Sequence, residues 1–268
     1  MKKRTKIILI CTIAAAFVIV CGVIALPYIW DSVRQAENKT LTPLDTGEVI
    51  PGVYVIRETD DIANLYLVKT PEDNYIAIDA GRNPEKVRSE IKKIGIDPAD
   101  VVAVFLTHSD DDHASGLPAF SNAVIYLHEK EVQMIDGTAK RSILGYNKWP
   151  DGVAYIAVAG NVTEKIMIGG IEVQGYLTAG HTPGSTCWRI ENMLFTGDNM
   201  SLSDGKAHLF NSLYNMDDHH QIADVNALLK EIDFFANFAD EPEVKYLFTA
   251  HYGYTDDAGA ALNGGLKR

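Results

Sequence analysis

The chain has 268 residues, of which 47% are hydrophobic and 22% are charged, and this balance excludes a disordered protein. It has only three cysteines, Cys11, Cys21 and Cys187, too few for a disulfide framework or a four-cysteine zinc site. The formal charge is −12, and because the first 30 residues carry four basic groups and no acid, the remainder carries −16, which argues against a nucleic-acid partner.

The first 30 residues predict a membrane anchor. Residues 7–26 form an uncharged, largely apolar run, long enough as a helix to span the roughly 30 Å hydrocarbon core of a bilayer. The four basic residues before this run place the N-terminus in the cytoplasm by the positive-inside rule. A cleaved signal peptide, which would release a secreted protein, is the alternative. We therefore expect a single-pass signal anchor at 1–30, a linker at 31–47 and an extracytoplasmic domain at 48–268.

The domain predicts strands and helices that follow one another in chain order. Short apolar or β-branched runs bounded by turn residues indicate strands, and apolar residues at helical spacing indicate two helices. The expected helices are 84–93 and a segment from Asp217 or Asp218 to about Phe235, and the expected strands are 52–56, 64–68, 75–79, 101–106, 124–127, 165–168, 171–177, 185–190, 193–195 and 244–249.

This order of elements favours a mixed α/β fold in which two sheets stack face to face and helices cover their outer faces. The segment 136–165 contains several Gly residues, Trp149 and Pro150 but no strand pattern, so we expect an irregular loop there. The residues that select a substrate are expected in 136–160 and 201–216.

Four polar clusters directly follow predicted strands. The clusters are THSDDDHASG at 107–116, GHTPGS at 180–185, FTGD at 195–198 and TAHYG at 249–253. Loops after strand ends can aim several side chains at one point. The first cluster alone carries three Asp and two His, whose mutual repulsion would be destabilising without a cation. Imidazole and carboxylate ligands together suit Zn²⁺, Fe or Mn²⁺.

The four motifs, in this order, resemble those of the metallo-β-lactamase-fold hydrolases. The first cluster is similar to that superfamily's His-x-His-x-Asp-His signature, with Asp110 at the position of the second His. The DAG sequence at 79–81 matches a structural feature of the family, an Asp at a strand end followed by a Gly. The resemblance covers roughly residues 48–255 and implies an αββα sandwich, the metallo-β-lactamase fold.

The resemblance also implies a binuclear metal centre. One metal would be held by His108, Asp110 and His181, the other by Asp112, His113 and His251, and Asp198 would bridge both. Two zinc ions are expected. The carboxylate at position 110 is a harder ligand than the imidazole of most members, and it therefore permits iron or manganese.

The implied reaction is hydrolysis of an ester, thioester, lactone or amide-type bond in a small molecule, by a hydroxide that bridges the two metals. Asp112 would orient this nucleophile and carry a proton to the leaving group. Tyr252 would donate a hydrogen bond to the developing oxyanion of the substrate. The fold does not choose among these bonds.

Two other functions stay open at the level of sequence. An iron-dependent oxidoreductase, of the persulfide dioxygenase or di-iron type, uses the same fold, and a non-catalytic metal-binding or sensor domain is compatible with the motifs. Asp111 is expected to be solvated, and Cys187 is expected to be a buried small hydrophobe and not a nucleophile. The histidines expected not to be ligands are His128, His208, His219 and His220.

Overall fold

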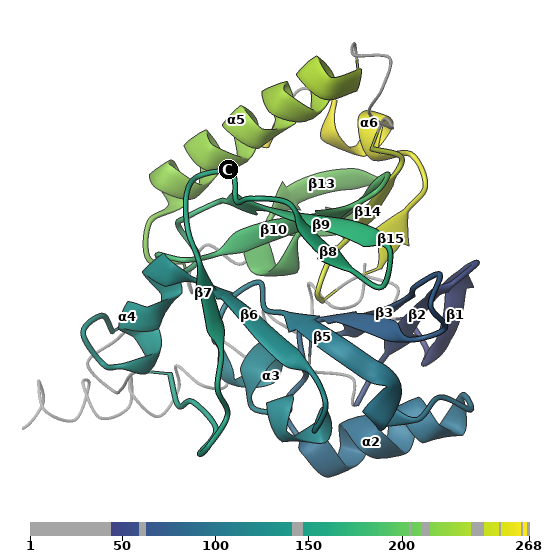
Figure 1. Ribbon diagram of the computed structural model, residues 1–268. Coiled ribbons are helices and arrows are strands. Elements are labelled where there is room, and N and C mark those ends of the chain that lie inside the picture. Colours follow the sequence, from purple (N-terminus) through teal and green to yellow (C-terminus); the bar gives the residue numbers. More distant parts are fainter. Residues whose placement is uncertain are drawn as a thin grey trace, which may run out of the picture. The chain divides into compact units, whose positions relative to one another are not determined.

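Two β-sheets stacked face to face, with helices on their outer surfaces, make up the part of the chain that the structure describes (Figure 1). The computed structural model describes residues 44–58, 63–140, 147–203, 205–210, 215–236, 244–251, 253–263 and 265–266. These residues belong to one compact unit, Pro43–Arg268. The predicted signal anchor and most of the predicted linker lie outside them. Within the described ranges, no helix is both long and apolar enough to cross a membrane.

The first sheet has seven strands in chain order. They are β1 (Gly47–Ile50), β2 (Val53–Ile56), β3 (Leu65–Lys69), β4 (Tyr75–Ile78), β5 (Val101–Phe105), β6 (Val124–His128) and β7 (Ile156–Val158). The first four pair antiparallel, as strands joined by short connections do, and β4 to β7 pair parallel. Parallel pairing requires longer crossovers, and the chain supplies one between β4 and β5 as a helix.

The second sheet has six strands in the order β15-β14-β11-β10-β9-β8. They are β8 (Ile166–Ile168), β9 (Ile171–Leu177), β10 (Thr186–Ile190), β11 (Met193–Phe195), β14 (Tyr246–Phe248) and β15 (Tyr254–Thr255). A separate hairpin, β12 (Met200–Ser203) and β13 (Lys206–Leu209), precedes the long helix of the C-terminal half.

Helices cover the outer face of each sheet (Figure 1). The α-helices are α2 (Pro84–Lys93), α3 (Asp111–Ala114), α4 (Val132–Ile135), α5 (Asp218–Ala236) and α6 (Ala258–Leu262), and the 3₁₀ turns are η1 (Pro98–Asp100), η2 (Leu117–Ala119), η3 (Glu129–Glu131) and η4 (Gly197–Asn199). The start of α2 is fixed by the Asn83 side chain, which accepts hydrogen bonds from the backbone N–H groups of Glu85 and Lys86. Val87 and Ile91 lie one turn apart on the buried face of α2.

Three apolar clusters fill the spaces between the layers. The central cluster lies between the sheets and includes Ile76, Phe105, Trp188 and Phe195. A second cluster packs the first sheet against α2, and a third packs the other sheet against α5. Each large buried side chain contributes about 1.5–3 kcal/mol to folding. The layers therefore form a rigid scaffold for the loops at the strand ends.

The strands and both helices expected from the sequence are present, with ends that differ by at most two residues. The expectation of an irregular loop throughout 136–165 is wrong, because β7 lies within it and pairs with β6. The β12–β13 hairpin was not expected either. Two of the three residues of β7 are exposed. The strands β12 and β13 are four residues each, and although Met200, Leu202, Ala207 and Leu209 pack against the third cluster, two apolar residues per strand are too few to predict a strand.

Candidate metal centre

The predicted ligands lie in loops that follow strands of both sheets. The first sheet supplies His108 and Asp110 after β5 and Asp112 and His113 in α3, and the second supplies His181 between β9 and β10, Asp198 in η4 and His251 after β14. Two hydrogen bonds fix the first group against the second sheet. The Trp188 indole N–H donates to the Leu106 carbonyl at 2.9 Å, and the Thr186 N–H donates to the Thr107 carbonyl at 2.9 Å.

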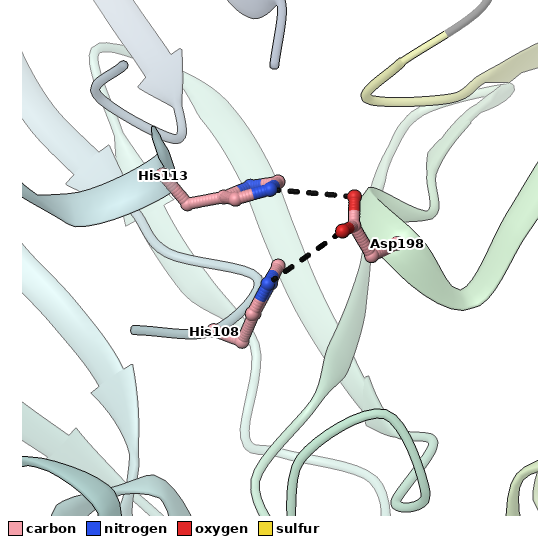
Figure 2. Close-up of side chains that lie close together, drawn as sticks. All are labelled: His108, His113 and Asp198. Carbon is pink, nitrogen blue, oxygen red and sulfur yellow. Dashed lines mark ion pairs between the residues drawn. The ribbon is translucent and has the colours of Figure 1, made fainter. Parts of the chain in front are cut away.

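The Asp198 carboxylate lies among four imidazoles, two on each oxygen. Its Oδ2 is 4.0 Å from Nε2 of His108 and 3.5 Å from Nε2 of His181. Its Oδ1 is 3.3 Å from Nε2 of His113 and 3.2 Å from Nε2 of His251. Figure 2 shows His108 and His113 pointing toward this carboxylate from neighbouring positions. One carboxylate therefore faces two separate pairs of nitrogen atoms.

One further carboxylate lies beside each pair of imidazoles, Asp110 beside His108 and His181, and Asp112 beside His113 and His251. Oδ2 of Asp110 lies 3.4 Å from Nε2 of His108 and 3.2 Å from Nε2 of His181. Oδ2 of Asp112 lies 3.5 Å from Nε2 of His251, and its Oδ1 lies 4.0 Å from Nε2 of His113. The three groups whose ligand atoms lie within 4.8 Å of one another are His108–His113–Asp198, His108–Asp110–His181 and Asp112–His113–His251. All seven predicted ligands are thus brought together.

The polar atoms of this cluster fit a cation. Nε2 of His108, Nε2 of His113 and Oδ1 of Asp198 are buried and make no hydrogen bond within the described part of the chain. A buried polar atom left in this state costs about 1–3 kcal/mol, and coordination to a metal would remove that cost. Imidazole nitrogen and carboxylate oxygen are the donor types that zinc accepts in catalytic sites.

The other ring nitrogen of three histidines is engaged outside the cluster. Nδ1 of His113 lies 2.8 Å from Oδ2 of Asp79, and Nδ1 of His181 lies 2.9 Å from Oδ1 of Asn215. Nδ1 of His108 lies 3.0 Å from the Thr107 hydroxyl, which donates to Asp79. Because these partners accept hydrogen bonds, the proton of each neutral imidazole belongs on Nδ1. The lone pair of Nε2 then faces the cluster, as a metal ligand requires.

The charges in the cluster shift the pKa values of its members. Burial would lower the pKa of His113, but the carboxylates of Asp198, Asp79 and Asp112 hold it well above its ordinary value. Burial would raise the pKa of Asp198, but His251 and His113 hold it well below its ordinary value. The pKa of His251 is also raised, because the attraction of Asp198 exceeds the effect of burial. The cluster therefore favours positive charge, which protons or metal ions can supply.

The backbone around the first cluster is tightly packed. Gly116 donates its N–H to the Gly81 carbonyl at 2.8 Å, and a Cβ at position 116 would lie 2.0 Å from the Ala80 carbonyl oxygen. Asp79 adopts a left-handed backbone conformation with φ 62°, and its carboxylate accepts hydrogen bonds from both the N–H and the hydroxyl of Thr107. The DAG motif and the last Gly of the first cluster thus fit together directly.

Comparison with known proteins agrees with this geometry. A family model described as the metallo-beta-lactamase superfamily matches residues 59–232, more than half of the chain. The chain belongs to the metallo-β-lactamase superfamily. The expected family and the expected mixed α/β metallo-β-lactamase fold of the domain are therefore confirmed.

Two curated zinc-dependent hydrolases are similar to about half of the chain. The probable polyketide biosynthesis zinc-dependent hydrolase BaeB of Bacillus velezensis is 28% identical over 126 residues, which are 46% of this chain and 48% of that protein. The corresponding hydrolase PksB of Bacillus subtilis is 27% identical over 126 residues. The chain thus matches about half the length of these curated relatives.

Solved structures show the same fold. A B3 metallo-β-lactamase described as having an active-site glutamic acid aligns with a TM-score of 0.60 and 20% identity, over 85% of this chain and 88% of its own. A metallo-β-lactamase from Cronobacter sakazakii aligns with a TM-score of 0.55 and 21% identity, over 79% of each chain. At these identities the likeness concerns the fold alone.

The remaining residues singled out from the sequence lie away from the cluster or outside the described residues. Tyr252 lies outside them. Asp111 is exposed and pairs with Arg82 at 2.6 Å. His128 lies 3.0 Å from the Gly160 carbonyl and belongs to no group of candidate ligands, and neither do the other three histidines set aside above.

Cys187 is fully buried in β10, and its thiol lies 3.5 Å from the Thr178 hydroxyl. Burial raises the pKa of this thiol to about 12. A thiol that stays protonated is a poor nucleophile, in keeping with the packing role expected for it.

Sequence reasoning missed four residues that contact the ligands or their loops. Asn215 holds His181, and the ring of Phe210 stacks on His251 with centroids 4.8 Å apart. Asn147 donates to Asp110, and the buried Glu131 joins two of the ligand loops. None of the four belongs to a recognisable motif. The only signal was that three of them, Asn147, Phe210 and Asn215, lie in the segments 136–160 and 201–216, where substrate-selecting residues were expected.

Proposed function

We propose that this chain is a metal-dependent hydrolase that cleaves an ester, thioester, lactone or amide-type bond in a small molecule. The observation that carries the proposal is the shared Asp198 carboxylate, whose two oxygens face two different pairs of imidazole nitrogens. This is the arrangement needed to hold two divalent ions side by side. The names of the curated relatives, zinc-dependent hydrolases, support the same reaction class.

The two ligand sets would each hold one ion. The first set is His108, Asp110 and His181, the second is Asp112, His113 and His251, and Asp198 would contact both ions. Two bound ions would supply an activated water and a Lewis acid for the scissile carbonyl. Zinc is the metal we propose, and the carboxylate of Asp110 in place of an imidazole also permits iron or manganese.

Asp112 is the residue that we propose to handle protons. Its side chain is 18% exposed, more than that of Asp198 at 7%, so it lies at the open side of the cluster. Its two oxygens face His251 and His113, which positions the carboxylate beside the second ligand set. A carboxylate held there can orient the attacking water and pass a proton to the leaving group.

The walls of the site would select the substrate. The half-buried ring of Phe210 stacks on His251 and places an apolar surface beside the second ligand set. We also propose that Tyr252, which follows His251 in sequence, donates a hydrogen bond to the substrate. The net charge of −16 after residue 30 favours a small substrate over a nucleic acid.

A substrate panel with matched variants tests the proposal. The purified full chain should hydrolyse at least one member of a set of generic esters, thioesters, lactones and β-lactams. Asp112→Asn should lower that turnover by about 100-fold or more, because it removes both a ligand charge and the proton carrier. Asp111→Asn, a neighbouring exposed change, should leave it unaltered.

The competing functions give different results in the same preparation. Oxygen consumption with a persulfide substrate, without hydrolysis, would favour the iron-dependent oxidoreductase. Bound metal with neither activity would favour a sensor or binding domain. Either result would overturn the proposed hydrolase function.

A further inference from the structure

The orientation of the Asp110 carboxylate is set from outside the cluster. Its Oδ2 faces Nε2 of His181 at 3.2 Å and Nε2 of His108 at 3.4 Å. Its Oδ1 accepts a hydrogen bond from Nδ2 of Asn147 at 2.8 Å. One oxygen is thus directed into the site and the other is held away from it.

A chain of hydrogen bonds connects Asn147 to a buried carboxylate. Nδ2 of Asn147 also donates to the Ser109 hydroxyl at 2.9 Å. That hydroxyl donates to Oε1 of Glu131 at 2.6 Å, and the Ser109 N–H donates to the same oxygen at 2.9 Å. The other oxygen of Glu131 accepts from the Thr182 hydroxyl at 2.6 Å and from the Gly184 N–H at 3.0 Å. The network therefore joins the loop of Asp110 to the loop of His181.

The donors and acceptors along this chain allow only one orientation of the Asn147 amide. Glu131 is fully buried and is met by four donors, two of them backbone N–H groups, so it accepts at every contact. The Ser109 hydroxyl donates its single hydrogen to Glu131, so it can only accept a hydrogen bond from Asn147. The Asp110 oxygen also accepts. Both hydrogens of the Asn147 amide are therefore donated, one to Asp110 and one to Ser109.

We infer that Asn147 is a positioning residue that makes Asp110 a one-oxygen ligand of the first metal position. The inference rests on the proposed function, since it assumes that the cluster holds metal. It adds that metal affinity at the first position depends on the Asn147 amide, which donates to Asp110. Metal affinity at the second position does not depend on this amide. Partners that orient ligands in this way change metal affinity by about 10–100-fold when they are removed.

Two substitutions of Asn147 test the inference by metal affinity and not by activity. The apo form of the purified full chain is titrated with Zn²⁺ in competition with a chromophoric chelator, which resolves the first and second equivalents. Asn147→Ala removes the donor, and Asn147→Asp places a second carboxylate against Asp110. Both should weaken one equivalent by about 10–100-fold, Asp more than Ala, and leave the other within about twofold. Asn122→Asp, an exposed asparagine that donates to the Ala99 carbonyl, is the control for added charge.

A double substitution shows whether Asn147 acts through Asp110. In an Asp110→Ala background, Asn147→Ala should weaken zinc binding by less than about twofold, because the group that it orients is gone. The thermal midpoint of each apo variant checks that the fold is retained. Equal weakening of both equivalents, no weakening of either, or full additivity with Asp110→Ala would overturn the inference. These outcomes differ from failure of the metal site on which the proposed function depends, in which the wild-type chain itself binds no zinc, and from failure of the hydrolase activity, which the substrate panel measures separately.

Discussion

The carboxylate of Asp79 lies 2.8 Å from Nδ1 of His113 and outside the cluster of candidate ligands. It accepts a hydrogen bond from the imidazole on one side and two hydrogen bonds from Thr107 on the other. This contact directs the lone pair of His113 toward Asp198. A residue at the end of β4 thus controls a ligand that is more than 30 positions later in the sequence.

Asp79→Asn is expected to lower zinc affinity by about 10–100-fold. The amide can present its N–H group to Nδ1, which would move the imidazole proton to Nε2 and point it into the cluster. Asparagine tolerates the left-handed backbone at this position, so the fold should survive. Chelator competition measures the effect, and the exposed Asp100→Asn is the control. Unchanged affinity would show that His113 does not need this partner.

Gly116→Ala is expected to destabilise the fold by about 1–3 kcal/mol, as overpacking does. A Cβ here would lie 2.0 Å from a carbonyl oxygen of the backbone, which cannot move aside as a flexible side chain can. The φ of Gly116 is −78°, so the effect is purely steric. Denaturant unfolding of the apo protein gives the change. Gly47→Ala, with no heavy atom within 4 Å of the added Cβ, should alter stability little.

His128→Asn is expected to reduce the loss of folding stability between pH 7 and pH 5. Burial lowers the pKa of His128 below 6.5, although its contact with the Gly160 carbonyl opposes this shift. The unfolded chain therefore binds a proton more readily than the folded one, so this residue makes stability fall as the pH drops from about 6.5 toward the lowered value. Asn keeps an acceptor for the Lys130 N–H and does not titrate. Chemical unfolding of the apo form at pH 5 and 7 measures the difference, with the exposed His219→Asn as control. A steeper or unaltered profile in His128→Asn would contradict the assignment.

Asp110→His is expected to shift metal preference toward zinc. The change replaces a hard anionic oxygen, now directed at His108 and His181, with a softer nitrogen donor. Elemental analysis after loading from an equimolar mixture of zinc, iron and manganese measures the ratio. The neighbouring exposed Asp111→His controls for an added imidazole. An identical metal ratio in wild type and Asp110→His would remove residue 110 from the ligand set.

The apolar pattern predicted most of the fold because the central strands of the sheets are buried on both faces. β3 and β4 are examples, since nearly every residue is inaccessible and the sequence reads as a continuous apolar run. β7 was not predicted because it has only three residues, of which two are exposed and only Val158 packs against the central cluster. The hairpin of β12 and β13 was not predicted because each strand has only four residues and two apolar positions, even though those apolar side chains pack against the third cluster. The signal anchor at 1–30 stays a prediction.

The candidate ligands could be predicted because their residue types and order are confined by coordination chemistry. The residues around them could not. Asn147 and Asn215 are ordinary amides in loops, and they reach Asp110 and His181 only after distant segments have folded together. Glu131 looks like one acid of a charged surface turn in the sequence, yet it is fully buried and joins two loops. Such contacts depend on tertiary structure and have no local pattern.

The most direct test of the central claim is elemental analysis of the purified full chain together with its hydrolase activity. We expect two divalent ions per chain, with zinc predominant, because Asp198 is shared by two pairs of imidazoles. Chelation should abolish hydrolysis and added zinc should restore it. A metal-free preparation that is folded and hydrolyses its substrate at the original rate would contradict the claim.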